Sequence, residues 1–258
     1  MRNDGLIVYG KNPVKELLES SGSGGRINTL YLLKGSKSHG EFRALAKQQG
    51  IVVKEVAAEK LNSLSGGERH GGVAAELSAL NENEGYASVE EILADSPCPF
   101  ILMCDEIEDP HNLGALIRTA EAAGADGVII PKRRGVAVTG AVYAASSGAA
   151  AHIKIARVTN LVHTIKDLKS RNIWVYGAES DGSPYTEVDF GGGKGVCLVI
   201  GSEGRGLGRL VRENCDFIVS IPMRGRVNSL NASVSGGILL FNIASKITAN
   251  TANTKGCG

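Results

Sequence analysis

The stretch "LVIGSEGRGLGRL", residues 198–210, places four glycines directly after an apolar run and ahead of a predicted helix. A phosphate-binding loop would end in Gly-Lys-Ser or Gly-Lys-Thr, and that ending is absent. A dinucleotide-binding fingerprint counted from Gly204 would need a third glycine where the chain has Arg209, and it belongs after the first strand of its fold. Two interpretations stay open: a tight strand-to-helix turn with Glu203 exposed, or a loop whose backbone approaches a ligand closely.

The apolar run before this loop is one of a series of short apolar segments that alternate with helical patterns. These segments are residues 100–104, 127–130, 152–156, 173–177, 196–200 and 217–221. Apolar strands that alternate with helices indicate a parallel sheet covered on both faces, in an α/β fold. Ligands of such sheets bind beyond the carboxyl ends of the strands. The candidate loops therefore follow Cys104, Gly177, Ile200 and Ile221.

The remainder of the chain divides into three further segments. Residues 1–80 alternate between short strands and helices, and Asn12 with Pro13 resembles the start of a helix, with Asn12 as the N-cap. Residues 81–97 are predicted to be an acidic linker that contains a short helix near Val89, because residues 81–96 carry five acidic and no basic side chains. Residues 98–247 form the larger predicted domain, and residues 248–258 are expected to be a disordered tail.

The composition is that of a globular protein. The 258 residues are 43% hydrophobic and 21% charged, with a net charge of +1, which alone neither favours nor excludes nucleic acid. No apolar run approaches the roughly 20 residues of a membrane helix, and the first residues lack the apolar core of a signal peptide, so a cytoplasmic location is expected. The five cysteines are expected to be reduced, and neither they nor the five histidines show metal-ligand spacing, so no metal site is predicted.

Two other predicted strand ends carry polar clusters. In "DEIEDPHNLGALIRTAEAAG", residues 105–124, either Asn112 or Asp109 could cap a helix, and Arg118 could form a surface ion pair with Glu121. In "IPMRGRVNSLNASVSGGILLFNIASKI", residues 221–247, small polar residues lead into an apolar helix that they could simply cap. Each cluster has an ordinary structural explanation, but three such clusters at the same predicted sheet edge favour a functional site.

The three segments "NLGALIRTAEAAG", "LVIGSEGRGLG" with "SIPM", and "VNSLNASVSGG" closely resemble the three signature motifs of the SpoU/TrmH family of RNA 2′-O-ribose methyltransferases, within the SPOUT superfamily. They occur in the family's order across residues 98–247. Residues 1–80, with "YGKNPVKELL" and "RHGGVAAEL", resemble the small α/β RNA-binding domain that precedes the catalytic domain in ribosomal RNA members. The resemblance implies a SPOUT-type parallel sheet with a C-terminal trefoil knot, a rare topology in proteins.

The resemblance also implies S-adenosylmethionine as cofactor, bound in the knot. Matched position by position, the residues expected to line its pocket are Gly177, Ala178, Gly201, Ile221, Met223, Ser229 and Leu230. The glycine loop quoted at the start would then be a close-approach loop around the methyl donor.

The positions that match the family's catalytic residues are Asn112, Arg118, Glu203, Ser229 and Asn231. Methyl transfer from a sulfonium to a hydroxyl is an in-line displacement, so orientation of the reactants can supply much of the acceleration. Because a guanidinium stays protonated in proteins, Arg118 is expected to stabilise the forming alkoxide and to position an RNA phosphate, not to act as a base. Glu203, Ser229 and Asn231 are expected to orient partners in this network.

RNA is the expected partner, with guanosine of 23S ribosomal RNA as the expected target. Candidate RNA contacts are the basic stretch 131–135 together with Arg205, Arg209, Arg224 and Arg226, which could equally be a solvated basic surface. A homodimer is expected, because sites in this family are completed across two protomers. The alternatives are a transfer RNA 2′-O-methyltransferase, a noncatalytic RNA-binding or ribosome assembly protein, and a nucleotide-dependent α/β enzyme of the NAD type.

Overall fold

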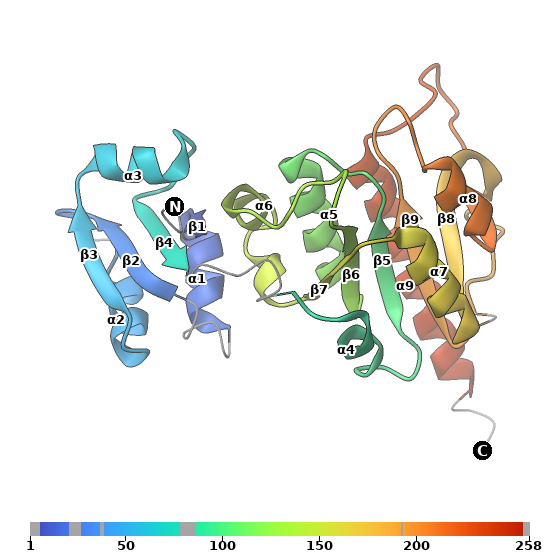
Figure 1. Ribbon diagram of the computed structural model, residues 1–258, viewed down its shortest axis with the longest axis horizontal. Coiled ribbons are helices and arrows are strands. Elements are labelled where there is room, and N and C mark those ends of the chain that lie inside the picture. The colour runs from blue at the N-terminus through green and yellow to red at the C-terminus, as the bar shows by residue number, and fades with distance from the viewer. Residues whose placement is uncertain (1–5, 21–26, 37–38, 78–85, 192, 255–258) are drawn as a thin grey trace. The chain divides into compact units, whose positions relative to one another are not determined.

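The chain folds into two compact units in the computed structural model (Figure 1). The structure describes residues 6–20, 27–36, 39–77, 86–191 and 193–254. The first unit comprises residues 1–85 and 138–152, and the second comprises residues 86–137 and 153–258. Residues 138–152, which the sequence analysis assigns to the larger domain, thus group with the first unit. The domain boundaries as a whole stay a prediction.

The first unit contains a four-stranded mixed sheet. Its elements are β1 (Ile7–Tyr9), α1 (Lys11–Glu19), β2 (Ile27–Leu33), α2 (Gly40–Gln48), β3 (Val52–Val56), α3 (Ala58–Ser65), β4 (Val73–Leu77), α6 (Gly140–Ala145) and the 3-10 turn η2 (Ala149–Ala151). The strand order is β1-β4-β2-β3, in which only β2 and β3 pair in parallel. A hydrogen bond of 2.8 Å between His152 Nε2 and Glu16 Oε2 joins residues 138–152 to α1 within this unit.

The start of α1 differs from the sequence prediction. The helix begins at Lys11 and its N-cap is Gly10, which has a φ of 101° and no side-chain cap, so Asn12 is not the capping residue. Pro13 lies in the first turn, where a missing N–H removes no helical hydrogen bond. The N-cap therefore lies two residues before the predicted one, because a glycine with positive φ replaces the expected side-chain cap.

The second unit is built on a six-stranded sheet in which every pair is parallel. Its strands are β5 (Phe100–Cys104), β6 (Gly127–Pro131), β7 (Lys154–Val158), β8 (Ile173–Pro184), β9 (Gly195–Ile200) and β10 (Phe217–Ser220), in the order β10-β8-β9-β5-β6-β7. Its helices are α4 (Val89–Leu93), α5 (Pro110–Ala122), α7 (Leu161–Ser170), α8 (Arg209–Asn214) and α9 (Ala232–Thr254). The predicted parallel α/β fold is therefore confirmed.

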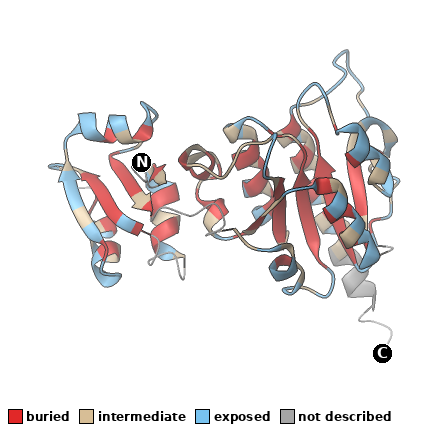
Figure 2. Ribbon diagram, viewed as in Figure 1, coloured by how far each residue is buried: buried red, intermediate tan, exposed pale blue. Residues whose placement is uncertain are grey.

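Both faces of this sheet are covered, as Figure 2 shows by the buried central strands. All residues of β5 and β9 are buried. On one face, Ile101 and Met103 of β5 pack with Ile165 and Leu168 of α7. On the other face α5 packs against α9, so closely that a Cβ on Gly236 would lie 2.3 Å from Leu116 Cδ2. Apolar residues in consecutive positions of each strand are the sequence signature of this arrangement.

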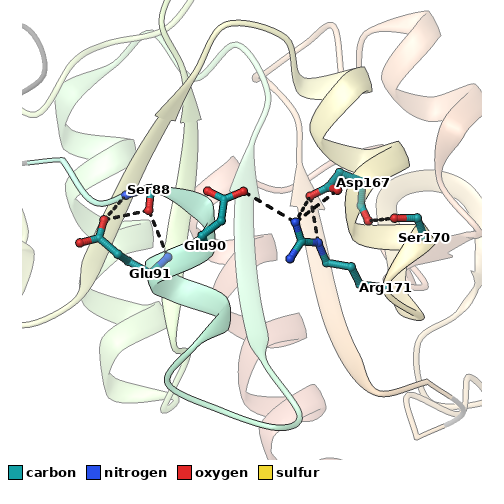
Figure 3. Close-up of polar contacts among 6 residues, drawn as sticks. All are labelled: Ser88, Glu90, Glu91, Asp167, Ser170 and Arg171. Carbon is teal, nitrogen blue, oxygen red and sulfur yellow. Dashed lines mark hydrogen bonds and ion pairs between the residues drawn. The ribbon is translucent and has the colours of Figure 1, made fainter.

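The amino-terminal edge of this sheet is held by surface polar contacts (Figure 3). Ser88 and Glu91 form a capping box on α4: Ser88 Oγ accepts from Glu91 N at 3.1 Å, and Glu91 Oε2 accepts from Ser88 N at 2.6 Å. Arg171 lies 3.7 Å from Glu90 and 3.1 Å from Asp167. Residues 81–85 of the predicted linker 81–97 lie outside the described residues. Residues 86–97 pack into the second unit through the fully buried Ile92 and are not extended as a linker would be.

The C-terminal helix runs further than expected. α9 extends to Thr254, so residues 248–254 continue a helix where the sequence analysis expects a disordered tail, and residues 255–258 lie outside the described residues. Extending an existing helix costs far less than starting one, which explains how a polar segment can remain helical. No described helix is long and apolar enough to cross a membrane. The trefoil knot stays a prediction, with which the strand order is consistent.

Candidate functional site

A cavity of about 520 Å³ lies in the second unit at the carboxyl ends of β9 and β10. Its volume falls within the usual range of small-molecule sites, about 300–1,000 Å³. The cavity is lined by Ala178, Glu179, Ser180, Ile200, Gly201, Ser202, Glu203, Gly204, Arg205, Gly206, Val219, Ile221, Met223, Asn228, Ser229, Leu230, Asn231, Ala232, Ser235 and Leu239. The cavity is therefore built from three chain segments distant in sequence, as the ligand rule for parallel sheets predicts.

An irregularity in β8 brings residues 178–180 to the cavity. Ile218 of β10 pairs with Gly177, but the next residue, Val219, pairs with Ser183. The residues of β8 between these two pairs therefore depart from the register of β10. This departure leaves Ala178, Glu179 and Ser180 free to form one wall of the cavity.

The glycine loop after β9 closes on itself. Ser202 N donates to the Gly206 carbonyl at 3.1 Å, and Gly206 N donates to the Ser202 carbonyl at 2.9 Å. Gly204 and Gly206 have φ angles of 82° and 66°, which other residues rarely adopt. A Cβ on Gly201 would lie 2.3 Å from the Gly206 carbonyl. The loop is thus both a tight turn and a wall of the cavity, which combines the two interpretations left open from the sequence.

Two carboxylates that the sequence analysis does not single out hold this loop in place. Glu179 Oε1 accepts from Leu207 N at 2.6 Å, and Asp105 Oδ2 accepts from Gly208 N at 2.7 Å. Asp105 is buried, and burial raises the pKa of its carboxyl above the ordinary value. Both acids follow predicted strand ends, and this position in the sequence is the signal that could have identified them.

Asn231 is the junction of the three signature segments. Its Oδ1 accepts from Ser233 N at 2.8 Å and from Val234 N at 3.3 Å, which caps α9. Its Nδ2 donates to Asn112 Oδ1 at 2.9 Å and also to Glu203 Oε1. One amide therefore caps a helix and links the other two motifs at the cavity.

The structure brings most of the predicted site residues together. Six of the predicted pocket residues line the cavity: Ala178, Gly201, Ile221, Met223, Ser229 and Leu230. Gly177 does not line it and packs instead against Leu207, Cys215 and Ile218, where a Cβ would clash.

The predicted catalytic residues divide between the cavity and its surroundings. Glu203, Ser229 and Asn231 line the cavity, and Asn112 joins through its bond to Asn231. Asp109, not Asn112, caps α5, since Asp109 Oδ1 accepts from His111 N at 3.0 Å. That leaves the Asn112 side chain available to Asn231. Arg118 is exposed on α5 and is not part of the cavity wall.

Family models match both parts of the chain. Residues 99–241 match the SpoU rRNA Methylase family, and residues 7–82 match the RNA 2′-O ribose methyltransferase substrate-binding family. The chain belongs to the SpoU rRNA Methylase family. Members of this SpoU family are RNA methyltransferases, and the N-terminal match extends the relationship to an RNA-binding domain.

Two bacterial relatives match this SpoU family member over almost its full length. YacO of Bacillus subtilis (strain 168), whose name places it in the TrmH family of tRNA/rRNA methyltransferases, is 44% identical over 248 residues, covering 93% of this chain and 95% of YacO. A TrmH family relative in Staphylococcus saprophyticus is 42% identical over 242 residues, covering 93% of this chain and 96% of the relative.

Two solved structures share the fold of this SpoU family member. The SpoU methyltransferase AviRb from Streptomyces viridochromogenes, in complex with AdoMet, superposes with a TM-score of 0.79 at 23% identity, covering 96% of this chain and 92% of AviRb. An AdoMet-bound rRNA methyltransferase from Sinorhizobium meliloti gives a TM-score of 0.75 at 25% identity, covering 94% of this chain and 87% of the other. The likeness confirms the predicted fold class in both units.

Proposed function

We propose that this protein transfers a methyl group from S-adenosylmethionine to a ribose 2′-hydroxyl of RNA. The observation that carries the proposal is the pair of hydrogen bonds from Asn231 to Asn112 and Glu203. These bonds lie beside the cavity, which is lined by six of the residues predicted to bind the cofactor. Family membership and AdoMet-bound neighbours of the same fold support the same chemistry.

The cavity suits S-adenosylmethionine chemically. Ile221, Leu230 and Leu239 offer apolar walls for an adenine ring, and the glycine loop offers backbone polar groups for its edge. Glu179 and Glu203 place two carboxylates in the lining, where they favour a cationic ligand. When bound, the cofactor supplies an electrophilic methyl group on a sulfonium.

The residues of this chain would orient the reactants. Asn231 fixes Asn112 and Glu203 in one network and is itself fixed as the cap of α9, so the network is rigid before the RNA arrives. Arg118 would contribute a permanent positive charge toward the forming alkoxide and an RNA phosphate. Because that function uses a planar guanidinium, Arg118→Lys is expected to lower turnover at least tenfold. Near-full turnover of the lysine variant would contradict this role.

A homodimer is part of the proposal, because Arg118 lies outside the wall of the cavity in its own chain. On α9, Val234 and Phe241 are about half exposed and stand seven residues apart, hence on one side of the helix. A second copy that covers this side would bury both and could bring its own Arg118 to the site. Light scattering would test the dimer, and Phe241→Lys is expected to shift it toward monomer.

The substrate that we propose is guanosine in 23S ribosomal RNA, and the cell compartment is the cytoplasm. The matches of residues 99–241 to the SpoU rRNA Methylase family and of residues 7–82 to an RNA 2′-O ribose methyltransferase substrate-binding family favour this target by analogy. The second candidate is transfer RNA, favoured by the tRNA/rRNA naming of the relatives. A noncatalytic RNA-binding protein would not need the intact network at Asn231.

Two measurements test the proposal together. Calorimetry should show binding of S-adenosylmethionine, and labelled methyl should pass to 23S ribosomal RNA from cells that lack the protein, at one ribose. Asn231→Asp should abolish transfer while it retains the helix cap. Cofactor binding without transfer to any ribosomal or transfer RNA would favour the noncatalytic alternative, and binding of NAD without S-adenosylmethionine would overturn the proposal.

A further inference from the structure

Two arginines from different loops share one carboxylate next to the cavity. Arg134 Nη1 lies 3.4 Å from Glu106 Oε1, and Arg205 Nη1 lies 3.8 Å from Glu106 Oε2. Arg205 also lies 3.9 Å from Glu108 and lines the cavity. Each oxygen of the Glu106 carboxylate therefore faces a different guanidinium.

The backbone holds this arrangement in an unusual conformation. Glu106 and Arg134 have φ angles of 53° and 60°, in the left-handed region that non-glycine residues rarely adopt. Such conformations persist only where surrounding structure imposes them, and they concentrate at functional sites. Here the loops are joined by a bond of 2.9 Å from Val136 N to the Ile107 carbonyl. Asp105 ties the same segment to the glycine loop through Gly208 N.

Exposure differs sharply within the cluster. The side chains of Arg134 and Arg205 are 82% and 75% exposed, whereas Glu106 is 24% exposed. The separations are longer than those of strong charge-assisted hydrogen bonds, so these pairs hold the guanidinium groups loosely. The arginines are thus oriented by the acid yet available to another anion.

We infer that Arg134 and Arg205 form a clasp for one RNA phosphodiester beside the cavity, and that Glu106 occupies this clasp until RNA binds. A phosphodiester presents two non-bridging oxygens, as a carboxylate does, and carries the same single charge, so it can replace Glu106 between the two guanidinium groups. Glu106 then acts as a positioning residue that preorganises the clasp and weakens indiscriminate RNA binding. The inference rests on the proposed function for the identity of the ligand.

The amino-terminal edge of the same sheet supplies a matched control. There Arg171 lies 3.7 Å from Glu90 (Figure 3), a separation similar to those in the clasp. Both side chains are exposed. This pair lies at the sheet edge opposite the cavity, where no ligand is expected. Arg171→Gln changes the net charge as each arginine substitution in the clasp does, and Glu90→Gln changes it as Glu106→Gln does, so these variants control for net charge.

The test measures binding of the full-length protein to a short labelled single-stranded RNA of mixed sequence at several salt concentrations. Log affinity falls as log salt rises, and each lost phosphate contact makes the magnitude of this slope smaller by about 0.7. We therefore expect Arg134→Gln and Arg205→Gln each to reduce the magnitude of the slope by up to that amount. Arg171→Gln should leave the slope and the affinity unchanged apart from a small effect of net charge.

Substitution of the acid gives the opposite result. Glu106→Gln should tighten RNA binding about two- to fivefold, in proportion to the loss of a loose competing ion pair. Glu90→Gln should not. In a chain that also carries Arg134→Gln and Arg205→Gln, the gain from Glu106→Gln should disappear, which shows that the acid acts through the clasp. Unchanged affinity for S-adenosylmethionine in Glu106→Gln and Arg134→Gln would show that the cavity is intact in these variants. Because Arg205 lines the cavity, the variants that carry Arg205→Gln are checked by an unchanged thermal unfolding midpoint instead.

Several outcomes would overturn the inference. Weaker or unchanged RNA binding by Glu106→Gln would do so, as would a slope change in Arg171→Gln equal to that in Arg205→Gln. Competition by inorganic phosphate as strong as that by RNA would show an anion site that is not specific for RNA. These failures would leave methyl transfer by the wild-type protein intact, whereas failure of the proposed function would remove transfer and leave the ion pairs unexplained.

Discussion

The two edges of the six-stranded sheet use the same kinds of side chain for different purposes. At the amino edge, Glu90, Arg171 and the Ser88 capping box make short-range surface contacts that fasten α4 and α7. At the carboxyl edge, Asn231 and Glu203 join segments distant in sequence around a cavity. Polar residues alone therefore do not mark a site; what distinguishes the carboxyl edge is that its polar residues surround a cavity.

The largest difference between the edges is expected from two glycine substitutions. Gly201→Ala would place a Cβ 2.3 Å from the Gly206 carbonyl, and Gly195→Ala would place one 2.6 Å from the Pro99 carbonyl. Because backbone must move in both, each should cost about 1–3 kcal/mol of stability. Only Gly201→Ala should also weaken S-adenosylmethionine binding, by tenfold or more. Calorimetry on the two folded variants measures their cofactor affinities. Equal affinities would contradict the proposed difference between the two edges.

Helix caps give a second, smaller contrast. Ser88→Ala at the amino edge and Asn231→Ala at the carboxyl edge each remove a cap, so each should lower stability by about 1 kcal/mol. The alanine at 231 should in addition reduce methyl transfer at least a hundredfold, because it also releases Asn112 and Glu203. Thermal unfolding and a transfer assay measure the two effects separately. Full transfer by Asn231→Ala would show that the junction has no role in the reaction.

Two aspartates should respond alike to pH, one at each edge: Asp105 is buried and Asp126 is partly buried. Burial raises the pKa of Asp105 and of Asp126, and each accepts a backbone N–H, from Gly208 and from Phe100. Since the folded state holds these protons to higher pH than the unfolded state, stability falls as pH rises from the ordinary aspartate pKa to the raised value. Each Asn variant should lose part of that slope in urea unfolding followed across acid pH. A steeper slope would contradict the burial argument.

The smallest effect is expected from the exposed ion pair at the amino edge. Arg171→Ala removes its contacts with Glu90 and Asp167, which in solvent contribute at most about 0.5–1 kcal/mol. Methyl transfer and cofactor binding should be unchanged. A loss of activity in this variant would mean that the amino edge also takes part in function.

Much of the second unit can be predicted from the sequence because its signals are local. Runs such as residues 100–104 and 196–200 are buried on both faces, and consecutive apolar residues record that directly. The same strands also predict which loops are candidates for ligand binding. The short helix Val89–Leu93 was also predicted, although its attachment to the sheet was not.

What the sequence could not supply is long-range pairing. Glu179 and Asp105 hold the glycine loop from strands that nothing local connects to it, and Glu106 acquires meaning only when two distant arginines face it. Gly177 was assigned to the cavity by motif position, yet its neighbours are Leu207 and Cys215. The cap of α1 was misplaced because a glycine with positive φ replaced the expected asparagine.

The pairing of β5 with β9 has a consequence for synthesis of the protein. Phe100 of β5 pairs with Val196 of β9. The two residues are 96 positions apart, so β5 leaves the ribosome 96 residues before β9. At about 5–20 residues per second, the nascent chain carries an unpaired apolar strand edge for roughly 5–20 seconds. During that interval β5 can pair only with β6, and the uncovered edge is open to aggregation or to a chaperone.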